Sequence, residues 1–354
     1  MERTSKLHLN LRITGSLVKG RIKLKDKIVV LLKEKKNEFL SGEELSISLG
    51  VTRAAIWKYI NTLREEGYNI ESSPKKGYKL LESPDVLTFG EIHNFLNTKF
   101  LGRNLIHYES IDSTNIKAKE IAREGCSDGT VVISEYQSSG KGRLGRQWVS
   151  PKGKGIWMSI ILKPDVDPSF ASKITLIGAA SVLKAMNNLG INNCSIKWPN
   201  DIVINNKKVS GILTEMSAEL TRINHIVIGI GINVNIDVED FSEELKSIAT
   251  SLKIEKNKSI DRKMLLAEVL NSFEPYYEEF IHNGHIPSTI DLCRENSILL
   301  QKEIQCIRGN SIFRAKAIDI SDNGELIVEL PDGKIEHIVS GEVSIRGLYG
   351  YVDS

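Results

Sequence analysis

The most informative segment of this 354-residue chain reads Gly140-Lys141-Gly142-Arg143-Leu144-Gly145-Arg146-Gln147-Trp148. Its three glycines leave the backbone free to adopt positive φ and to approach a ligand closely. Lys141, Arg143 and Arg146 alternate with them, and an aromatic ring follows. A flexible basic loop of this kind suits a phosphate, because consecutive backbone N–H groups and fixed positive charge can surround one anion.

Two common phosphate-binding motifs do not fit this loop. Its glycines spell G-x-G-x-x-G, but a dinucleotide fingerprint needs a helix at the third glycine. Residues 147–153 have no amphipathic helical pattern. A Walker A loop would need glycine and then Ser or Thr where the chain has Glu135 and Gly142. Taken alone, a segment of this composition is more often a solvated basic surface loop.

Composition indicates a soluble, multidomain protein with a basic N-terminal part. Hydrophobic residues make up 41% and charged residues 26% of the chain, and the net charge is +2. Residues 1–82 hold 17 Lys and Arg against 10 Asp and Glu, so the remainder is acidic. This asymmetry favours nucleic acid as a partner of the first part. The four cysteines form no C-x-x-C pair, and no apolar run is long enough for a membrane span. We therefore expect a cytoplasmic protein without a membrane partner.

After a basic extension, residues 1–25, which we expect to be disordered, residues 26–83 have the pattern of a small DNA-binding domain. A first apolar helix precedes a capping box formed by Ser41 and Glu44. The second helix stops at Gly50, and Thr52 caps a third helix that ends at Gly67. Two short helices joined by a tight glycine turn are typical of a helix-turn-helix.

The exposed start of the third helix and the hairpin after it are the predicted DNA-binding elements. Residues 68–80 read as a β-hairpin with a basic tip, the wing of a winged helix. The predicted DNA contacts are Thr52, Arg53, Ala54, Trp57, Lys58, Lys75 and Lys76. The alternative is a helical module that binds protein.

Beyond a linker at residues 83–85, strands and helices alternate without the rhythm of a doubly wound fold. Strands are predicted at residues 105–108, 130–134, 156–162 and 226–233, and residues 194–201 are predicted as a short strand broken by proline and followed by a hairpin around residues 205–206. Helices are predicted from Asp112 to Gly125, at residues 171–189, and at residues 261–280 with a kink at Pro275. In the tail, Asn323-Gly324 and Asp332-Gly333 are strong hairpin signals and predict a small β-barrel.

Six motifs in order make this chain resemble the biotin–protein ligases, over about residues 26–350. They are residues 112–115 (DSTN), 135–137 (EYQ), 140–148, 197–201 (KWPND), 211–215 (GILTE) and 229–234 (GIGINV). With a winged helix in front, the chain resembles the bifunctional subclass that is also the biotin operon repressor. The resemblance implies an α+β fold with three domains. These are the winged helix-turn-helix, a class II synthetase-like biotinyl-lipoyl ligase domain with a mixed sheet at residues 84–296, and an SH3-like β-barrel at residues 297–354.

The resemblance also implies the reaction and its partners. Biotin and ATP with Mg²⁺ would form biotinoyl-5′-AMP, and a lysine of a biotin carboxyl carrier protein would then take the biotinoyl group. Two anions, a carboxylate and the α-phosphate, must be brought together, so positioning and electrostatics would carry catalysis. Operator DNA and a second copy of the chain, as a homodimer, would be the other partners.

Site roles are carried over from the resemblance. The implied biotin contacts are Ser113, Thr114, Asn115, Gln137, Lys141, Gly142, Arg143, Lys197, Gly211, Ile212 and Leu213. The implied nucleotide contacts are Arg143, Arg146, Trp148, Asn200 and Asn233, with Trp148 stacking on adenine. Lys197 and Arg143 would be catalytic, and Asn200 and Asp201 would position magnesium or Lys197. No metal ligand is assigned. For residues 113–115 a simple helix N-cap is the structural alternative, and for both glycine strands it is sheet packing.

The loop departs from the family in one respect. Family loops often read Gly-Arg-Gly-Arg-Arg-Gly-Arg, whereas Lys141 and Leu144 replace two arginines here. Lysine keeps the charge without the bidentate fork, and leucine loses it, so we expect a faster release of the adenylate. The loop is also expected to order over the ligand and thereby couple ligand binding to DNA binding. Three alternatives remain open: a ligase without repressor activity, a biotin sensor without ligase activity, and a lipoate ligase.

Overall fold

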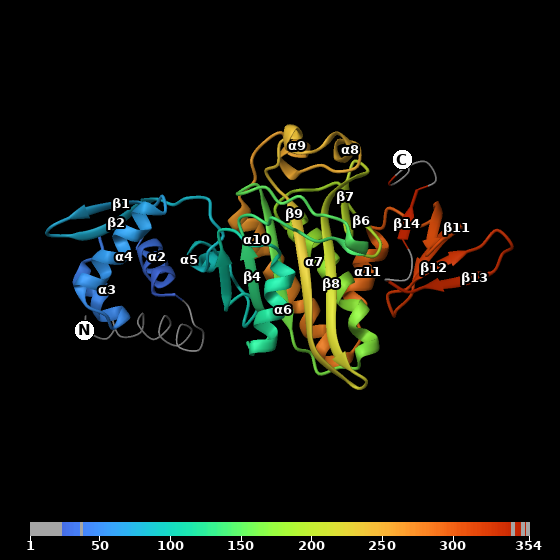
Figure 1. Cartoon of the computed structure of the whole chain (residues 1–354), viewed down its shortest axis with the longest axis horizontal. Helices are drawn as coiled ribbons and strands as arrows, with labels where there is room; N and C mark the ends of the chain where they lie inside the picture. The colour runs from blue at the N-terminus through green and yellow to red at the C-terminus, as the bar shows by residue number, and fades with distance from the viewer. Residues whose placement is uncertain (1–22, 36–37, 341–343, 348–350, 352–354) are drawn as a thin grey trace.

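The chain folds into three parts in a row, with the N-terminal helices at one end and a small sheet at the other (Figure 1). They are seen in a computed structural model that describes residues 23–35, 38–340, 344–347 and 351. The extension predicted at residues 1–25 lies outside the described residues as far as residue 22. The predicted α+β class and mixed central sheet are confirmed.

The N-terminal part consists of the predicted three helices and a hairpin. Ser41 Oγ accepts a hydrogen bond from Glu44 N at 3.0 Å, and the Glu44 carboxylate accepts one from Ser41 N at 2.9 Å, which confirms the capping box. Gly50 ends the second helix at a φ of 66°, and the Thr52 hydroxyl oxygen accepts an N–H of the next helix's first turn. The elements are α2 (Leu24–Glu34), α3 (Gly42–Leu49), α4 (Arg53–Glu65), β1 (Asn69–Ser73) and β2 (Gly77–Glu82).

Helix α4 has one buried face and one exposed face. Ile56, Ile60 and Leu63 are fully buried against α2 and α3, because residues spaced three and four apart share one side of a helix. The side chains predicted to contact DNA are therefore left exposed, and Trp57 is 60% exposed.

The central part is a seven-stranded sheet in the order β3-β4-β5-β9-β8-β7-β6. Strands β3 and β4 are parallel, and every other neighbouring pair is antiparallel. Strand β9 begins four residues before its predicted start at residue 226. The strands are β3 (Leu105–Tyr108), β4 (Thr130–Ser134), β5 (Gly155–Leu162), β6 (Cys194–Lys197), β7 (Asp201–Ile204), β8 (Lys207–Glu219) and β9 (Arg222–Asn233).

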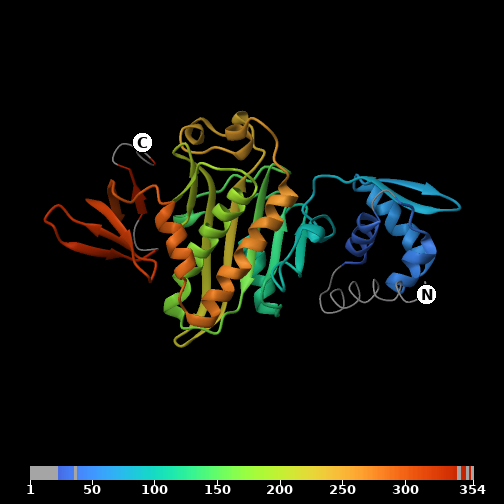
Figure 2. The ribbon, with the colours of Figure 1, turned by 180° about the vertical axis from the view of Figure 1, so that it is seen from behind.

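Helices cover the two faces of this sheet unequally. Helix α6 (Thr114–Glu124) lies on one face, and α7 (Lys173–Asn188), α10 (Arg262–Asn283) and α11 (Pro287–Glu295) lie on the other (Figures 1 and 2). Helix α10 continues through Pro275 and ends three residues beyond the prediction, where Gly284 adopts a φ of 64°. The short helices α5 (Phe89–Ile92), α8 (Glu243–Lys246) and α9 (Leu252–Lys256) lie in the connections.

The C-terminal part is a five-stranded antiparallel sheet in the order β13-β12-β11-β10-β14. Both predicted hairpin turns are present, with Gly324 and Gly333 at positive φ. The described pairings do not join β13 to β14, so closure into an SH3-like barrel stays a prediction. The strands are β10 (Glu303–Arg308), β11 (Ser311–Ile320), β12 (Leu326–Glu329), β13 (Ile335–Ile338) and β14 (Ser344–Arg346). Their apolar side chains join the central core, and Trp198 Nε1 donates to Gly324 O at 3.0 Å.

A buried arginine ties the linker to the central part. Arg262 is fully buried at the start of α10, and its guanidinium donates to Glu135 Oε2 at 2.9 Å and to Asp85 Oδ2 at 3.0 Å. The other oxygen of Glu135 accepts from Leu87 N at 2.8 Å. Because Glu135 directly follows β4, the linker after residue 83 is held directly against the central sheet.

A second ionic contact joins the N-terminal part to the same region. Glu91 is fully buried in α5 and pairs with Lys33 of α2 at 2.6 Å and with Lys263 of α10 at 3.0 Å. Asp26 Oδ1 accepts a hydrogen bond from Gly90 N at 3.2 Å. The N-terminal part is thus docked on the central part through buried polar contacts.

Candidate functional site

The floor of the site is a stripe of glycines across the centre of the sheet. Gly231 of β9 pairs with Trp157 of β5 and with Gly211 of β8. Gly229 precedes Gly231 by two residues on β9 and therefore lies on the same face of the sheet. Because side chains alternate along a strand, these glycines open one face of the sheet, while the neighbouring isoleucines of β8 and β9 face α7. The resulting cavity measures about 610 Å³.

At one end of the cavity, polar side chains at the start of α6 form a buried network. The Thr114 backbone N–H donates to Gln137 Oε1 at 2.8 Å, and Gln137 Nε2 donates to Ser150 Oγ at 2.9 Å. The hydroxyl of Ser159 donates to Asn115 Oδ1 at 2.6 Å. Ser113 occupies the N-cap position without a side-chain capping bond, so a simple N-cap does not account for this segment.

The basic loop folds back over the glycine stripe. Its ends are joined by a hydrogen bond from Trp148 N to Gly140 O at 2.9 Å, and its tip by one from Gly142 N to Arg146 O at 2.7 Å. Leu144 adopts a φ of 56°, and its side chain is 73% exposed. The dinucleotide interpretation is excluded by the structure, because the loop contains only the short 3₁₀ helix η2 (Arg143–Gly145) and returns to extended backbone.

Trp148 closes the loop against the sheet. A Cβ atom on Gly231 would approach the Trp148 ring to 2.7 Å, and one on Gly211 would approach it to 2.9 Å. The ring meets Trp157 edge-on, with 6.5 Å between centroids. Its Nε1 is buried and has no hydrogen-bond partner among the described residues. The floor glycines are therefore required for this aromatic wall.

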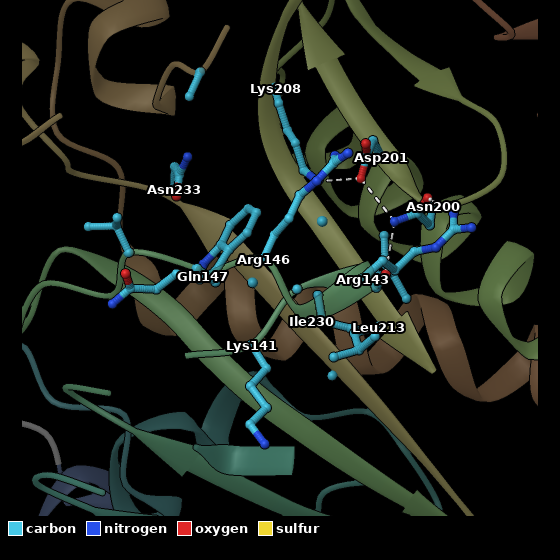
Figure 3. Close-up of a pocket in the computed structure, with 18 of the residues that line it drawn as sticks. Lys141, Arg143, Arg146, Gln147, Asn200, Asp201, Lys208, Leu213, Ile230 and Asn233 are labelled. Carbon is cyan, nitrogen blue, oxygen red and sulfur yellow. Dashed lines mark hydrogen bonds and ion pairs between the residues drawn. The ribbon is translucent and has the colours of Figure 1, made fainter. Parts of the chain in front are cut away.

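A chain of polar contacts forms the opposite wall (Figure 3). Arg143 Nη1 donates to Asn200 Oδ1 at 2.7 Å, and Asn200 Nδ2 donates to Asp201 Oδ1 at 3.1 Å. The same carboxylate forms an ion pair with Lys208 Nζ at 2.5 Å. Asp201 thereby links Lys208, at the start of β8, to Asn200 in the turn after β6, and Asn200 in turn holds Arg143 of the basic loop.

Lys197 lies at the end of β6 and is only 4% exposed. Its Nζ sits 3.4 Å from the centroid of the Tyr351 ring, and the Tyr351 hydroxyl donates to Asp201. Burial lowers the pKa of Lys197 to about 7, although the nearby Asp201 carboxylate raises it. The ammonium group therefore sits in a site where an added anion would be strongly attracted.

The residues predicted to bind biotin or nucleotide all line this one cavity. They come from separate segments of the chain: Ser113, Thr114, Asn115, Gln137, Lys141, Gly142, Arg143, Arg146, Trp148, Lys197, Asn200, Gly211, Ile212, Leu213 and Asn233. Their individual roles stay predictions. The side chain of Asn233 already donates to Thr250 O at 3.0 Å, which limits what it can offer a ligand.

Among the lining residues that were absent from the predicted site, Lys208, Arg346 and Tyr351 carry polar or charged groups into the cavity. Lys208 precedes the Gly211 segment by three positions, and a cation so close to a glycine strand was a usable signal. Arg346 and Tyr351 belong to the C-terminal part and reach the cavity only through the tertiary fold. No local pattern in the sequence could have assigned them.

The predicted DNA-binding residues form a surface remote from the cavity, on α4 and the hairpin. Thr52, Arg53, Ala54, Trp57 and Lys58 are exposed, as are Lys75 and Lys76 at the hairpin tip. Lys76 Nζ lies 5.6 Å from the centroid of the Phe39 ring. This combination of a projecting aromatic residue and cations suits the edge and backbone of a duplex.

Comparison with known families assigns each part of the chain. Residues 25–79 match a helix-turn-helix (HTH) domain family, and residues 108–233 match the biotin/lipoate A/B protein ligase family. Residues 300–346 match the biotin protein ligase C-terminal domain.

Similar proteins cover nearly the whole chain. The bifunctional ligase/repressor BirA of Bacillus subtilis (strain 168) is 38% identical over 92% of this chain and 99% of its own length. The protein of the same name from Escherichia coli (strain K12) is 30% identical over 90% of this chain and 96% of its own length. Among solved structures, a biotin protein ligase from Aquifex aeolicus in complex with biotin and ATP has a TM-score of 0.60 and 31% identity, covering 69% of this chain and 98% of that one.

Proposed function

The chain belongs to the biotin protein ligase family, in the branch of bifunctional ligases and repressors, and we propose that its central cavity binds biotin and ATP side by side. The protein activates biotin with ATP to biotinoyl-5′-AMP and transfers biotin to a lysine of a biotin carboxyl carrier protein. It also represses transcription through its N-terminal domain. The observation that carries the proposed site is the convergence of all the predicted ligand residues on one cavity.

In this proposal the fused ring of biotin lies at the start of α6. Thr114, Asn115 and Gln137 are buried there in a hydrogen-bonded network that orients hydroxyl and amide groups. A ureido group offers one carbonyl acceptor and two N–H donors, and such a network can match both. Buried polar groups discriminate strongly between ligands, because an unmatched ligand leaves them unpaired.

The reacting groups lie at the other wall in this proposal. Lys197 attracts the biotin carboxylate and the α-phosphate, whose mutual repulsion otherwise keeps them apart. Arg143 adds a second cation, and it is already oriented by Asn200. Trp148 and the glycine stripe provide an apolar surface for adenine, with the cationic loop over the phosphates. No nucleophile on the enzyme is required, because a carboxylate oxygen of biotin attacks the α-phosphorus itself and pyrophosphate leaves as that bond forms.

The residues present fit magnesium as a companion of ATP. Within the described ranges, no three His, Cys, Asp or Glu side chains converge as a metal site. Magnesium commonly uses one or two carboxylates together with substrate phosphates, and Asp201 is a carboxylate in the wall where the phosphates would lie. When bound, the ion would neutralise phosphate charge. Asp201 would hold it in exchange for the ion pair with Lys208.

We further propose a homodimeric, cytoplasmic protein with domains at residues 26–83, 84–296 and 297–354. The separate apolar core around α2, α3 and α4 supports the first boundary. The shared core of the central and C-terminal parts supports tight packing across the second. None of the helices in the described part of the chain combines the length and the apolar character that crossing a membrane would require.

The test is biotin-dependent exchange between ATP and pyrophosphate by wild type, Lys197→Ala and the exposed-lysine control Lys184→Ala. The proposal expects exchange that requires biotin, is not supported by lipoate, and is lost only in Lys197→Ala. Exchange by a folded Lys197→Ala protein at the wild-type rate would refute the role of Lys197. Exchange that requires lipoate in place of biotin would refute the proposed pocket.

A further inference from the structure

The carboxamide of Asn115 is held at both ends by the protein. Its Nδ2 donates to Glu215 Oε2 at 2.8 Å and to Leu213 O at 3.3 Å. Its Oδ1 accepts the hydroxyl hydrogen of Ser159 at 2.6 Å. Glu215 and Leu213 lie on β8 and Ser159 lies on β5. The two strands that flank β9 therefore both form hydrogen bonds with the Asn115 side chain of α6.

This arrangement leaves Asn115 with one kind of hydrogen bond to offer. Both hydrogens of Nδ2 are used in hydrogen bonds to Glu215 and Leu213. A carboxamide oxygen can accept two hydrogen bonds, and Oδ1 accepts only one from the protein, so it can accept one more. Oδ1 lies directly over Gly229, where any Cβ atom would collide with it. Gly229 and Asn115 both line the cavity. A ligand therefore meets Asn115 as an acceptor.

Glu215 is the stronger of the two acceptors that set this orientation, because it is charged and lies at 2.8 Å from Nδ2, whereas the Leu213 carbonyl oxygen lies at 3.3 Å. If the carboxamide turned over, Nδ2 would face Ser159, whose oxygen can accept a hydrogen bond while its O–H donates to Thr114 Oγ1, 2.8 Å away. Oδ1 would then face the Glu215 carboxylate and, at a longer distance, the Leu213 carbonyl oxygen, and acceptors repel one another. The side chain of Ser159 tolerates both orientations, and that of Glu215 tolerates one.

Glu215 is itself held as a charged acceptor, behind the wall of the cavity. Its Oε1 forms an ion pair with Lys119 Nζ at 2.8 Å, one turn along α6 from Asn115. Burial raises the pKa of Glu215, but the hydrogen bonds from Lys119 and Asn115 outweigh it and hold the pKa below its usual value. Glu215 is not among the residues that line the cavity.

We propose that Glu215, held by Lys119, is a positioning residue that fixes Asn115 as the acceptor for an N–H group of the ureido ring of biotin. This inference rests on the proposed placement of biotin against Asn115. It adds a residue that never touches the ligand and yet sets which hydrogen bond the ligand must donate.

The test is the affinity of the full-length protein for biotin alone, measured by isothermal titration calorimetry without nucleotide. The variants are Glu215→Leu, Asn115→Ala and the double variant, with Glu219→Leu as the control because Glu219 is exposed on the same strand. Glu215→Leu should weaken binding by about 10- to 100-fold, the cost of an unmatched buried hydrogen bond. In the Asn115→Ala background the same change should alter the affinity less than about twofold, since interacting residues are not additive. Glu219→Leu should bind as wild type.

The outcomes separate the two levels of the proposal. An equal loss from Glu215→Leu in both backgrounds would refute the positioning role and leave the biotin placement intact. Wild-type affinity in Asn115→Ala would overturn the biotin placement and the positioning role with it. Thermal unfolding and ATP binding check that each variant is folded. If Glu215→Leu is unstable, Glu215→Gln replaces it in the test. This variant keeps the shape of the side chain but places an amide beside Lys119, and it should lose less affinity for biotin than Glu215→Leu.

Discussion

The depressed pKa of Lys197 predicts an alkaline limit to biotin activation. Burial lowers this pKa from 10.5 to about 7 in the ligand-free site. A lysine with a lowered pKa loses its charge at lower pH, and only the ammonium form attracts the two reacting anions. At pH 8 the protonated fraction is about one tenth, and at pH 9 about one hundredth.

The kinetic constants should report this titration in different ways. The value of kcat/KM for biotin reflects the free enzyme, so it should fall about tenfold per pH unit above pH 7. Bound carboxylate and phosphate favour the charged lysine, so the fall in kcat should begin at higher pH. The assay is the biotin-dependent exchange of ATP and pyrophosphate from pH 6 to pH 9.5 at constant ionic strength.

A conservative substitution identifies the titrating group. Arginine stays protonated above pH 12, so Lys197→Arg should have a lower rate but no fall in kcat/KM between pH 7 and pH 9.5. The Tyr351 hydroxyl does not interfere, because burial raises its pKa well above the usual value. The reasoning is refuted if Lys197→Arg keeps the wild-type alkaline fall, or if the wild type shows no fall below pH 9.5.

Four further changes test other parts of the structure. Gly231→Val should displace the Trp148 ring, as overpacking costs about 1–3 kcal/mol, and raise KM for ATP about tenfold or more in the exchange assay. Trp57→Ala should weaken operator binding by about 10- to 100-fold in fluorescence anisotropy while biotinylation of the carrier stays unchanged; a parallel loss of ligase activity would contradict a separate DNA surface. Arg262→Met removes the arginine partner of the buried Glu135 carboxylate and should lower the free energy of unfolding in urea by about 3–5 kcal/mol, and a loss below 1 kcal/mol would show that the ion pair contributes little. Leu144→Arg adds a charge at an exposed loop position and should slow release of the adenylate by about two- to fivefold, followed by stopped-flow fluorescence; faster release would contradict the electrostatic account of the loop.

The sequence by itself predicted the local elements and a set of candidate ligand residues, all of which line one cavity. Capping at Ser41 and Thr52, the stop at Gly50 and the hairpin turns at Gly324 and Gly333 depend on side chains and backbone preferences within a few residues, so they can be predicted without the fold. The ordered motifs identified the family for the same reason, since each motif is contiguous.

The tertiary structure alone decided what each residue touches. The motifs contain Glu215 and Asn115, but only the strand order β5-β9-β8 brings Ser159 and Glu215 to opposite ends of one carboxamide. The same applies to Tyr351 over Lys197.

The depressed pKa of Lys197 likewise comes from long-range packing. A pKa depends on desolvation and on charges brought from distant positions, and neither is encoded within a local window of sequence. Pairing across a sheet and packing between domains bring together residues that are far apart in the chain. The contacts within the site therefore follow from the fold, whereas the types of residue that make up the site could be read from the sequence.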